Sequence, residues 1–534
     1  MGIVAGLIDE IGIVAYINEK LGTDAREKVS AGIIVKAMLL NGLGFVSAPL
    51  YMFEQFFTGI ATEHLLGEGI KPEHLNDDRL GEVLDKLHEQ GLSEIFLGIS
   101  LSAAQIFGVA VKSVHLDSTS FHLHGKYEED VLTETDQDGT LAEPSAIEIT
   151  YGYSRDHRPD LKQFVMNLIC TGDGDIPLWL EMANGNQSDK AKFTKILQAF
   201  QEQWSFDGLC VADSALYSQA NLQAMAGLNW LTRVPLTLKE GQQSIEQAKD
   251  FQPSQFKGYT IAQSTSDYAG VKQRWFITLS EKRRTSDLKQ LEKQLENAQK
   301  QAQQNLKKLC TQEFACETDA LMAAQTLSQD LPWHELSDCA AEVKKHYERS
   351  GKPAASDTPV RIGYSLSATL RPDEDKIARY RKRAGRFILA TNVLDIAVLS
   401  ADDALKEYKG QQGTERGFRF LKDPLFFASS VFLKTPKRIA ALGMIMALCL
   451  LVYSLGQRQL RNALSDATQT IPNQLGKPTE TPTLRWVFQC FMAVHLVVIS
   501  GVKQIVNLTP ERRHILKFLS DRCCGYYLLH GPDP

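Results

Sequence analysis

Three carboxylates in the sequence have positions suited to metal-dependent chemistry. Asp117 lies in the run HLDST, Asp213 in CVADSALY, and Glu415 in the segment YKGQQGTERGFRFLKDP (408–424). Carboxylates that converge on one point repel one another unless divalent cations neutralise them. Oxygen ligands suit Mg²⁺ or Mn²⁺, and two such ions about 4 Å apart can activate the attacking oxygen and steady the leaving oxygen during attack on phosphorus. The three acids therefore predict a two-metal site for phosphoryl transfer.

The segment around Glu415 is otherwise basic. Intervals of three, four and seven residues place four of its side chains within roughly 60° on one face of a helix. These are Tyr408, Gln411, Glu415 and Lys422. Such a face makes poor core and a good surface for phosphate, and Arg416 and Arg419 flank it. Three glycines, at 410, 413 and 417, disfavour a helix by about 1 kcal/mol each. They indicate either close approach of a nucleic-acid backbone or a helix that begins later.

Each acid also has an ordinary explanation. Asp213, or Ser214 beside it, could cap the following helix. Asp117 could occupy an edge position of a strand, although aspartate is depleted in strands. Glu415 could be solvated on a helix surface. The residues alone leave these alternatives open.

The elements that must position the acids alternate between strands and helices. Apolar patterns predict strands at 111–125, 163–171, 176–183, 208–214 and 229–235. Helices are expected at 188–204, with Ser188 as its N-cap, and between the last two strands. The expected order is β-β-β-α-β-α-β. A further strand at 385–393 precedes a helix that starts at Ser400 and leads to Glu415.

The segment 281–311 has the pattern of a coiled-coil seam. Apolar residues and one asparagine recur at alternating intervals of three and four. They are Leu288, Leu291, Leu295, Ala298, Ala302, Asn305 and Leu309. The seam fits a dimer contact or an arm over a partner, or else an intramolecular helix hairpin.

Composition excludes several classes of protein. Nine cysteines are scattered through the 534 residues without a C-x-x-C pair, so neither a disulfide framework nor a zinc site is expected. The N-terminal run has no basic region, which argues against a signal peptide. The uncharged segment 439–456 is interpreted as a buried helix rather than a membrane span. A net charge of −6 does not indicate nucleic-acid binding, but the sequence has local basic stretches at 281–284, 379–386, 434–438 and 511–514.

The combined pattern resembles a known family. The string Tyr408-x2-Gln411-x3-Glu415-x6-Lys422 resembles the Tyr-Arg-Glu-Lys signature of DDE transposases from bacterial insertion sequences of the insertion-sequence-four type, except that glutamine replaces the arginine. HLDSTSFHLHG and VADSALYS look like the regions of that family's first two catalytic aspartates. The resemblance covers nearly the whole chain. It implies that Asp117, Asp213 and Glu415 are catalytic and bind two Mg²⁺ (or Mn²⁺) ions. It also implies DNA binding by Tyr408, Gln411, Arg416, Arg419 and Lys422.

The family implies an α/β fold: an RNase H-like catalytic core interrupted by an insertion domain. With the sequence pattern this predicts a helical N-terminal domain at 1–110 that binds DNA ends, and the first half of the core at 111–235. The insertion domain is expected at 236–385, the second half of the core at 386–464, and a linker followed by helices, including one at 484–501, at 465–534.

The expected activity is cut-and-paste transposition. The enzyme would bind the ends of an insertion sequence, hydrolyse a phosphodiester at each end and join the freed 3′-hydroxyl to target DNA. Double-stranded DNA is the expected partner, with a homodimer assembled on it, no membrane association, and a location in the bacterial cytoplasm at the nucleoid. Two alternatives stay open: a catalytically inactive DNA-binding descendant, and a metal-dependent nuclease that does not join strands.

Overall fold

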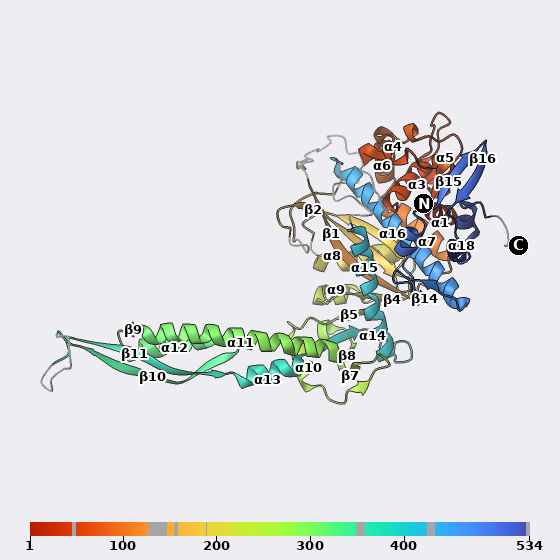
Figure 1. The fold of residues 1–534 in the computed structure, drawn as a ribbon. Coiled ribbons are helices and arrows are strands. Elements are labelled where there is room, and N and C mark those ends of the chain that lie inside the picture. The colour runs from red at the N-terminus through yellow and green to blue at the C-terminus, as the bar shows by residue number, and fades with distance from the viewer. Residues whose placement is uncertain are drawn as a thin grey trace, which may run out of the picture. The chain divides into compact units, whose positions relative to one another are not determined.

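A computed structural model describes residues 1–44, 50–124, 127, 147–153, 158–187, 189–348, 358–423 and 433–529. The chain forms two compact units, whose elements are labelled in Figure 1. The first comprises Met1–Thr232, Tyr268–Val271 and Ala404–Pro534. The second comprises Arg233–Asp267 and Lys272–Asp403.

The described residues before 107 form helices and no strand, as the sequence predicts. The α-helices are α1 (Gly2–Ile11), α2 (Ile13–Leu21), α3 (Ala31–Gly42), α4 (Phe53–Phe57), α5 (Thr62–Leu66), α6 (Asp77–Glu89) and α7 (Leu92–Ile106). The sequence of α6 explains its formation: the Asn76 side chain accepts a hydrogen bond from the Arg79 amide at 2.9 Å, and Asp77 and Asp78 favour the positive end of the helix dipole.

A mixed sheet forms the centre of the first unit. Its strands are β1 (Ser113–Leu123), β2 (Lys162–Thr171), β3 (Pro177–Ala183), β4 (Leu209–Ala212) and β5 (Asn229–Arg233). They lie in the order β3-β2-β1-β4-β5, with β1–β2 and β2–β3 antiparallel and β1–β4 and β4–β5 parallel. Helices α8 (Asp189–Gln203) and α9 (Gln219–Ala224) connect β3 to β4 and β4 to β5. This confirms the predicted order of elements and the α/β class; Ser188, the expected cap of α8, lies outside the described residues.

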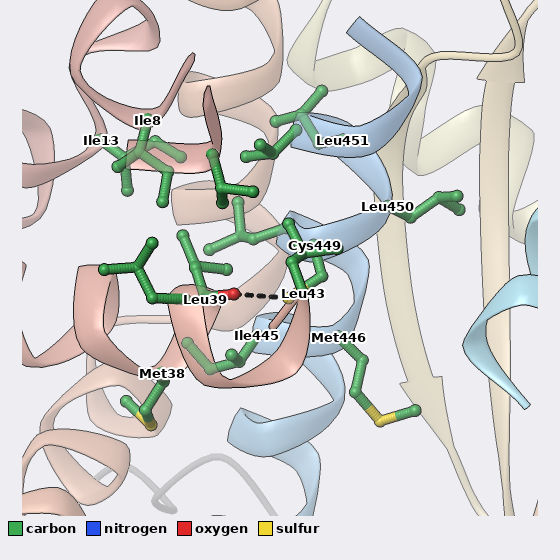
Figure 2. Packing of buried hydrophobic residues seen from close by; sticks show 14 of the residues in the cluster. Ile8, Ile13, Met38, Leu39, Leu43, Ile445, Met446, Cys449, Leu450 and Leu451 are labelled. Atoms are coloured by element: carbon green, nitrogen blue, oxygen red, sulfur yellow. Dashed lines mark hydrogen bonds between the residues drawn. The ribbon is translucent and has the colours of Figure 1, made fainter. Parts of the chain in front are cut away.

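One long helix, α16 (Pro436–Asp466), joins the helical layer to the sheet. It packs against α3, α6 and α7 as well as β3. Figure 2 shows Leu39 and Leu43 beside Ile445 and Cys449, whose thiol lies 3.9 Å from the Leu39 carbonyl. α16 is long and apolar enough to cross a membrane, and 89% of its most apolar window is buried inside the protein. It is the core helix expected from residues 439–456.

The C-terminal region corrects one prediction. Helix α17 (Leu484–Cys490) ends early, and the run His495–Ile499 is strand β15, paired with β16 (Val502–Val506). The expected helix over 484–501 is therefore wrong in its second half, because the run HLVVI is rich in β-branched residues that favour strands. The remaining elements are β13 (Ile471–Pro472), β14 (Pro478–Thr479), α18 (Pro510–Leu516) and α19 (Asp521–Gly525).

The second unit contains strands of its own and one long helix. Strands β12 (Arg386–Thr391), β8 (Gln273–Ser280), β7 (Tyr259–Ser266) and β6 (Gln252–Pro253) are neighbours in that order. A smaller sheet has the order β10 (His334–His346), β11 (Arg361–Pro372) and β9 (Glu313–Phe314). The helices are α10 (Lys239–Gln247), α11 (Glu281–Thr311), α12 (Glu317–Asp330) and α13 (Glu374–Arg383).

The predicted seam of α11 packs within the chain. α11 contacts α12, β10 and β11, with Leu291 and Ala302 almost fully buried. The seam therefore packs within the chain, but against strands β10 and β11 as well as helix α12 rather than as a simple helix hairpin.

Candidate active site

Asp117 and Asp213 lie beside each other where the pairing of two parallel strands ends. β1 and β4 pair with Leu116 opposite Ala212, and each aspartate follows that matched pair by one residue. Asp117 is buried, at 8% exposure, and Asp213 is half-buried. Functional groups of α/β sheets gather at the carboxyl ends of parallel strands. The structure therefore brings the first two predicted acids together at such an edge.

Local hydrogen bonds fix both aspartates. Asp117 Oδ1 accepts a bond from the Ser118 amide at 2.8 Å. Asp213 Oδ1 accepts one from the Ala215 amide at 2.8 Å, and the Asp213 carbonyl accepts one from Thr232 Oγ1 at 2.6 Å. A tight turn following β4 and a hydroxyl of the next strand thus hold Asp213.

Neither Asp213 nor Ser214 caps the following helix. The side chain of Ser218 performs this role for α9, accepting a bond from the Asn221 amide at 3.4 Å. The capping explanation of Asp213 is therefore wrong.

Glu415 lies on a helix that lines the same cavity. The expected helix is interrupted at Gln411, which separates α14 (Ala401–Gly410) from α15 (Gln412–Leu421). Gln411 has right-handed helical dihedral angles, so the chain direction changes little there. A cavity of about 370 Å³ is lined by Asp117, Ser118, Thr119, Asp213, Gln411, Glu415, Phe418, Arg419 and Lys422. Six of the eight predicted site residues share this cavity.

Tyr408 and Arg416 do not line the cavity. Arg416 is exposed and lies 3.3 Å from Asp175 Oδ2, in the turn between β2 and β3. Tyr408 lies on α14, half-buried, before the break at Gln411. The expected face of four side chains is therefore divided: Gln411, Glu415 and Lys422 line the cavity, and Tyr408 does not.

The glycines of this segment accommodate the protein's own chain. A Cβ at Gly413 would lie 1.7 Å from Asp175 Oδ1, and one at Gly417 would lie 3.0 Å from the Leu450 side chain. At Gly410 it would lie 3.1 Å from the His115 ring. Close packing of α14 and α15 explains the three glycines, and the interpretations of a later helix start or of an approaching DNA backbone are not needed.

A polar contact fastens α14 to β1. Glu407 Oε2 accepts a hydrogen bond from Ser113 Oγ at 2.5 Å and lies 3.7 Å from Nε2 of the buried His115. The contact with His115, followed by the bond from Ser113, lowers the pKa of Glu407. The helix that precedes Glu415 is thereby held against the strand that carries Asp117.

Sequence reasoning missed several residues of this site. Ser118 and Thr119 line the cavity, and the polar run DSTS inside a buried strand was the available signal. Phe418 completes its wall. Asp175 gave no signal, since an aspartate in the turn GDGD is ordinary and its contact with Gly413 is long-range.

The cavity has both charges that phosphoryl transfer requires. Arg419 and Lys422 face it alongside the three carboxylates. Lys422 Nζ lies 5.7 Å from the centre of the Phe121 ring, and Phe121 stacks on Phe164. The charged end of Lys422 thus lies within cation–π range of an aromatic ring, beside the cavity that a phosphate would enter.

The donor atoms fit a divalent cation in kind. Carboxylate oxygens are the ligands that Mg²⁺ and Mn²⁺ prefer. Across the described ranges, no three His, Cys, Asp or Glu side chains form a group that could hold a metal ion in this arrangement. The fit therefore rests on the chemistry of Asp117, Asp213 and Glu415 and on their shared cavity.

Comparison with known proteins agrees with this chemistry. A family model described as "Transposase DDE domain" matches residues 114–452, and one described as a domain of unknown function (DUF4277) matches residues 1–101. No curated protein matches the chain significantly.

Two solved structures are similar at low identity. A piggyBac transposase synaptic complex with hairpin DNA has a TM-score of 0.36 at 8% identity, over 97% of this chain and 78% of the other. A Mos1 transposase paired-end complex with the left transposon end has a TM-score of 0.15 at 13% identity, over 40% and 60%. The family model spans more than half of the chain and includes all three acids of the cavity, and the chain therefore belongs to the DDE transposases.

Proposed function

We propose that Asp117, Asp213 and Glu415 form the active site with which this transposase cuts and joins DNA. The observation that carries this proposal is the shared cavity. Three carboxylates from segments far apart in the sequence line one space of about 370 Å³, with Arg419 and Lys422 beside them. A structural role would not require acids from three separate elements to meet at one opening.

Each residue has a role that follows from its place. Asp117 and Asp213 are held rigidly by their own strands and turns, which favours precise positioning. Glu415 reaches the same cavity from α15. Arg419 and Lys422 would bind the phosphate on either side of the cleaved bond. Gln411, only 7% exposed, offers an amide where the related family signature has arginine, so its contact with DNA would be weaker.

The three carboxylates would hold two divalent cations, Mg²⁺ or Mn²⁺. When bound, these cations supply charge neutralisation at the phosphate and a lower pKa for the attacking water. Asp117 and Asp213 follow a matched pair of parallel strands, and neighbouring carboxylates repel one another unless a cation neutralises them, which supports a cation-binding role.

The wider proposal is cut-and-paste transposition of an insertion sequence of the insertion-sequence-four type. The core would be RNase H-like, interrupted by an insertion at 236–385. Helices of residues 1–110 would bind the element ends. The chain would act as a homodimer on DNA, at the nucleoid in a bacterial cytoplasm. Membership of the transposase family supports the reaction class.

A cleavage and strand-transfer assay tests the proposal. The purified chain is incubated with Mg²⁺, DNA carrying the element ends and flanking sequence, and target DNA. Asp117→Asn, Asp213→Asn and Glu415→Gln should each reduce both products by at least about 1,000-fold while leaving DNA binding intact. Glu202→Gln is the matched control, because Glu202 is an exposed carboxylate on α8 outside the cavity.

Three other results would contradict parts of this proposal. Full activity of Glu415→Gln would mean that Glu415 is a solvated residue and that the third ligand lies elsewhere. Cleavage without joined products in the wild type would mean a nuclease. Absence of both products in the wild type would contradict the catalytic assignment.

A further inference from the structure

Five exposed lysines form a straight line along α11. At 100° per residue they lie within about 40° of one another around the helix axis, and they extend over about 37 Å. They are Lys282, Lys289, Lys293, Lys300 and Lys307, and we call them the lysine stripe.

The lysine stripe points away from the core of its unit. The seam of α11 centres about 180° from the stripe around the helix axis. Leu291 and Ala302 of this seam are 2% and 1% exposed, and the helix packs through it on α12 and β11, which lie alongside it in Figure 1. Because packing fixes one side of α11, the opposite side with all five lysines is presented to solvent.

The stripe has few acids beside it. A solvated helix face usually intersperses opposite charges three or four residues apart. Here Glu296, three residues after Lys293 and four before Lys300, is the only acid of α11 within about 40° of the stripe's centre line. Glu292, three residues after Lys289, lies about 80° from that line, and Lys282 and Lys307 have no acid of α11 three or four residues away. None of the five lysines forms an ion pair with an acid of the described residues, whereas Arg283 on the same helix lies 3.7 Å from Asp287.

The neighbours of the stripe are hydrogen-bonding side chains. Ser286, Asn297 and Gln304 lie about 40–60° from its centre line, on one flank. Hydroxyl and amide groups at such places donate readily to phosphate oxygens. The whole face therefore combines separated positive charges with neutral donors.

We propose that the lysine stripe binds the sugar–phosphate backbone of duplex DNA. Its length of about 37 Å corresponds to one helical turn of the duplex, about 34–36 Å. Lysines are flexible point charges that contact phosphates without reading bases. The stripe thus provides sequence-independent affinity for DNA outside the catalytic cavity. This inference rests on the proposed function, because it takes the substrate to be DNA.

Salt-dependent binding of the full-length chain tests this inference. The probe is a 40-base-pair duplex of unrelated sequence, and its affinity is measured by fluorescence anisotropy across a range of salt concentrations. One variant replaces all five lysines of the stripe with glutamine. Each lost phosphate contact should lower the slope of log K against log salt by about 1, hence by about 4–5 in all, and weaken binding at least about tenfold at 0.1 M salt.

A second variant controls for net charge. It replaces five other exposed lysines of the same unit with glutamine: Lys239, Lys249, Lys257, Lys344 and Lys345. It should retain nearly the whole slope. A third variant, with arginine at the five stripe positions, should bind as tightly as the wild type. Thermal unfolding of each variant verifies that it is folded.

Several results would overturn the inference. Equal weakening by the stripe and control variants would mean that only net charge matters. An unchanged slope in the stripe variant would mean that DNA does not lie there. Loss of binding to duplex RNA but not to duplex DNA would assign the face to another partner.

Failure of the proposed function has a separate signature. The stripe variant keeps its cavity, so it should still cleave element ends at low salt and saturating protein. If Asp117→Asn still cleaves, the catalytic assignment fails, whatever the stripe variant does. If Asp117→Asn is inactive and the stripe variant binds DNA normally, only the present inference fails.

Discussion

Asp175 Oδ1 occupies the space directly beside the α-carbon of Gly413, where a Cβ would lie only 1.7 Å away. Asp175 has a positive φ of 57° in the turn between β2 and β3, and its other oxygen lies 3.3 Å from Arg416. A turn of the sheet is thus fitted against the first turn of the helix that carries Glu415. We expect the position of Glu415 to depend on this contact.

Gly413→Ala should displace α15 and reduce DNA cleavage. The added methyl group cannot coexist with the Asp175 carboxylate, so the helix or the turn must move, and a shift near 1 Å at a catalytic group costs about 100-fold in rate. Gly227→Ala, whose Cβ would contact nothing within 4 Å, is the control. Adding Asp175→Gly should restore much of the rate, since glycine also accepts the positive φ. If Gly413→Ala cleaved DNA at the wild-type rate, the contact between Asp175 and Gly413 would not be needed to position α15.

Arg419 and Arg416 should respond differently to replacement by glutamine. Arg419 lines the cavity, so Arg419→Gln should weaken binding of the cleaved DNA end and lower the salt slope by about 1. Arg416 is 64% exposed in its pair with Asp175, so Arg416→Gln should change the free energy of unfolding by less than about 1 kcal/mol. Anisotropy and urea unfolding measure the two effects. Weaker DNA binding by Arg416→Gln and unchanged DNA binding by Arg419→Gln would assign the DNA contact to Arg416 instead.

Thr232→Val should destabilise the protein and slow cleavage together. Its fully buried hydroxyl donates to the Asp213 carbonyl at 2.6 Å, and removing it costs about 1–3 kcal/mol. Thr232→Ser retains the hydroxyl and should behave nearly as wild type in cleavage. Urea unfolding and single-turnover cleavage provide the comparison. Equal behaviour of the two variants would mean that the bond does not position Asp213.

Glu407→Gln should destabilise the protein most near neutral pH. The contact with His115 and the bond from Ser113 lower the pKa of Glu407 in the folded state. The resulting stability is present above the ordinary pKa of 4.5 and is lost as the pH falls through the lowered value. The difference in melting temperature from wild type should therefore shrink as the pH falls below about 4.5. A constant difference across pH would indicate a loss of packing alone.

Asp117→Cys should change the metal requirement of cleavage. A thiolate is a softer ligand than a carboxylate, so it disfavours Mg²⁺ more than Mn²⁺. We expect cleavage to be lost in Mg²⁺ and partly regained in Mn²⁺, with Asp117→Ala inactive in both. Removing metal with a chelator should stop cleavage by the wild type while leaving DNA binding intact. Equal activity of Asp117→Cys in the two metals would argue against ligation at residue 117.

Local patterns predicted much of the fold, whereas long-range fit could not be predicted. The alternation of HLDSTSFHL and the apolar run CVA were sufficient to place β1 and β4, and helical spacing placed Gln411, Glu415 and Lys422 on one face. The glycines were misinterpreted because the groups they approach, such as Asp175, are distant in sequence.

The C-terminal strand shows the second limit. The run 484–501 is mostly apolar, and its few polar residues do not give a period that distinguishes a helix from a strand. Trp486, which lies in helix α17, donates a hydrogen bond from Nε1 to the Pro472 carbonyl at 2.8 Å. The β-branched residues that follow pair with Val502–Val506 as a hairpin. The strand preference of these β-branched residues and their pairing in the hairpin together determine where the helix stops.

The packing of α16 has a consequence for the evolution of this chain. The two family models meet between residues 101 and 114, yet α16 lies against α3, α6 and α7 from one and β3 from the other. A recombination event that exchanged residues 1–101 alone would leave one side of this largely buried helix without its matching surface. The N-terminal helices and the catalytic segment are therefore expected to be inherited together, as a single unit of descent.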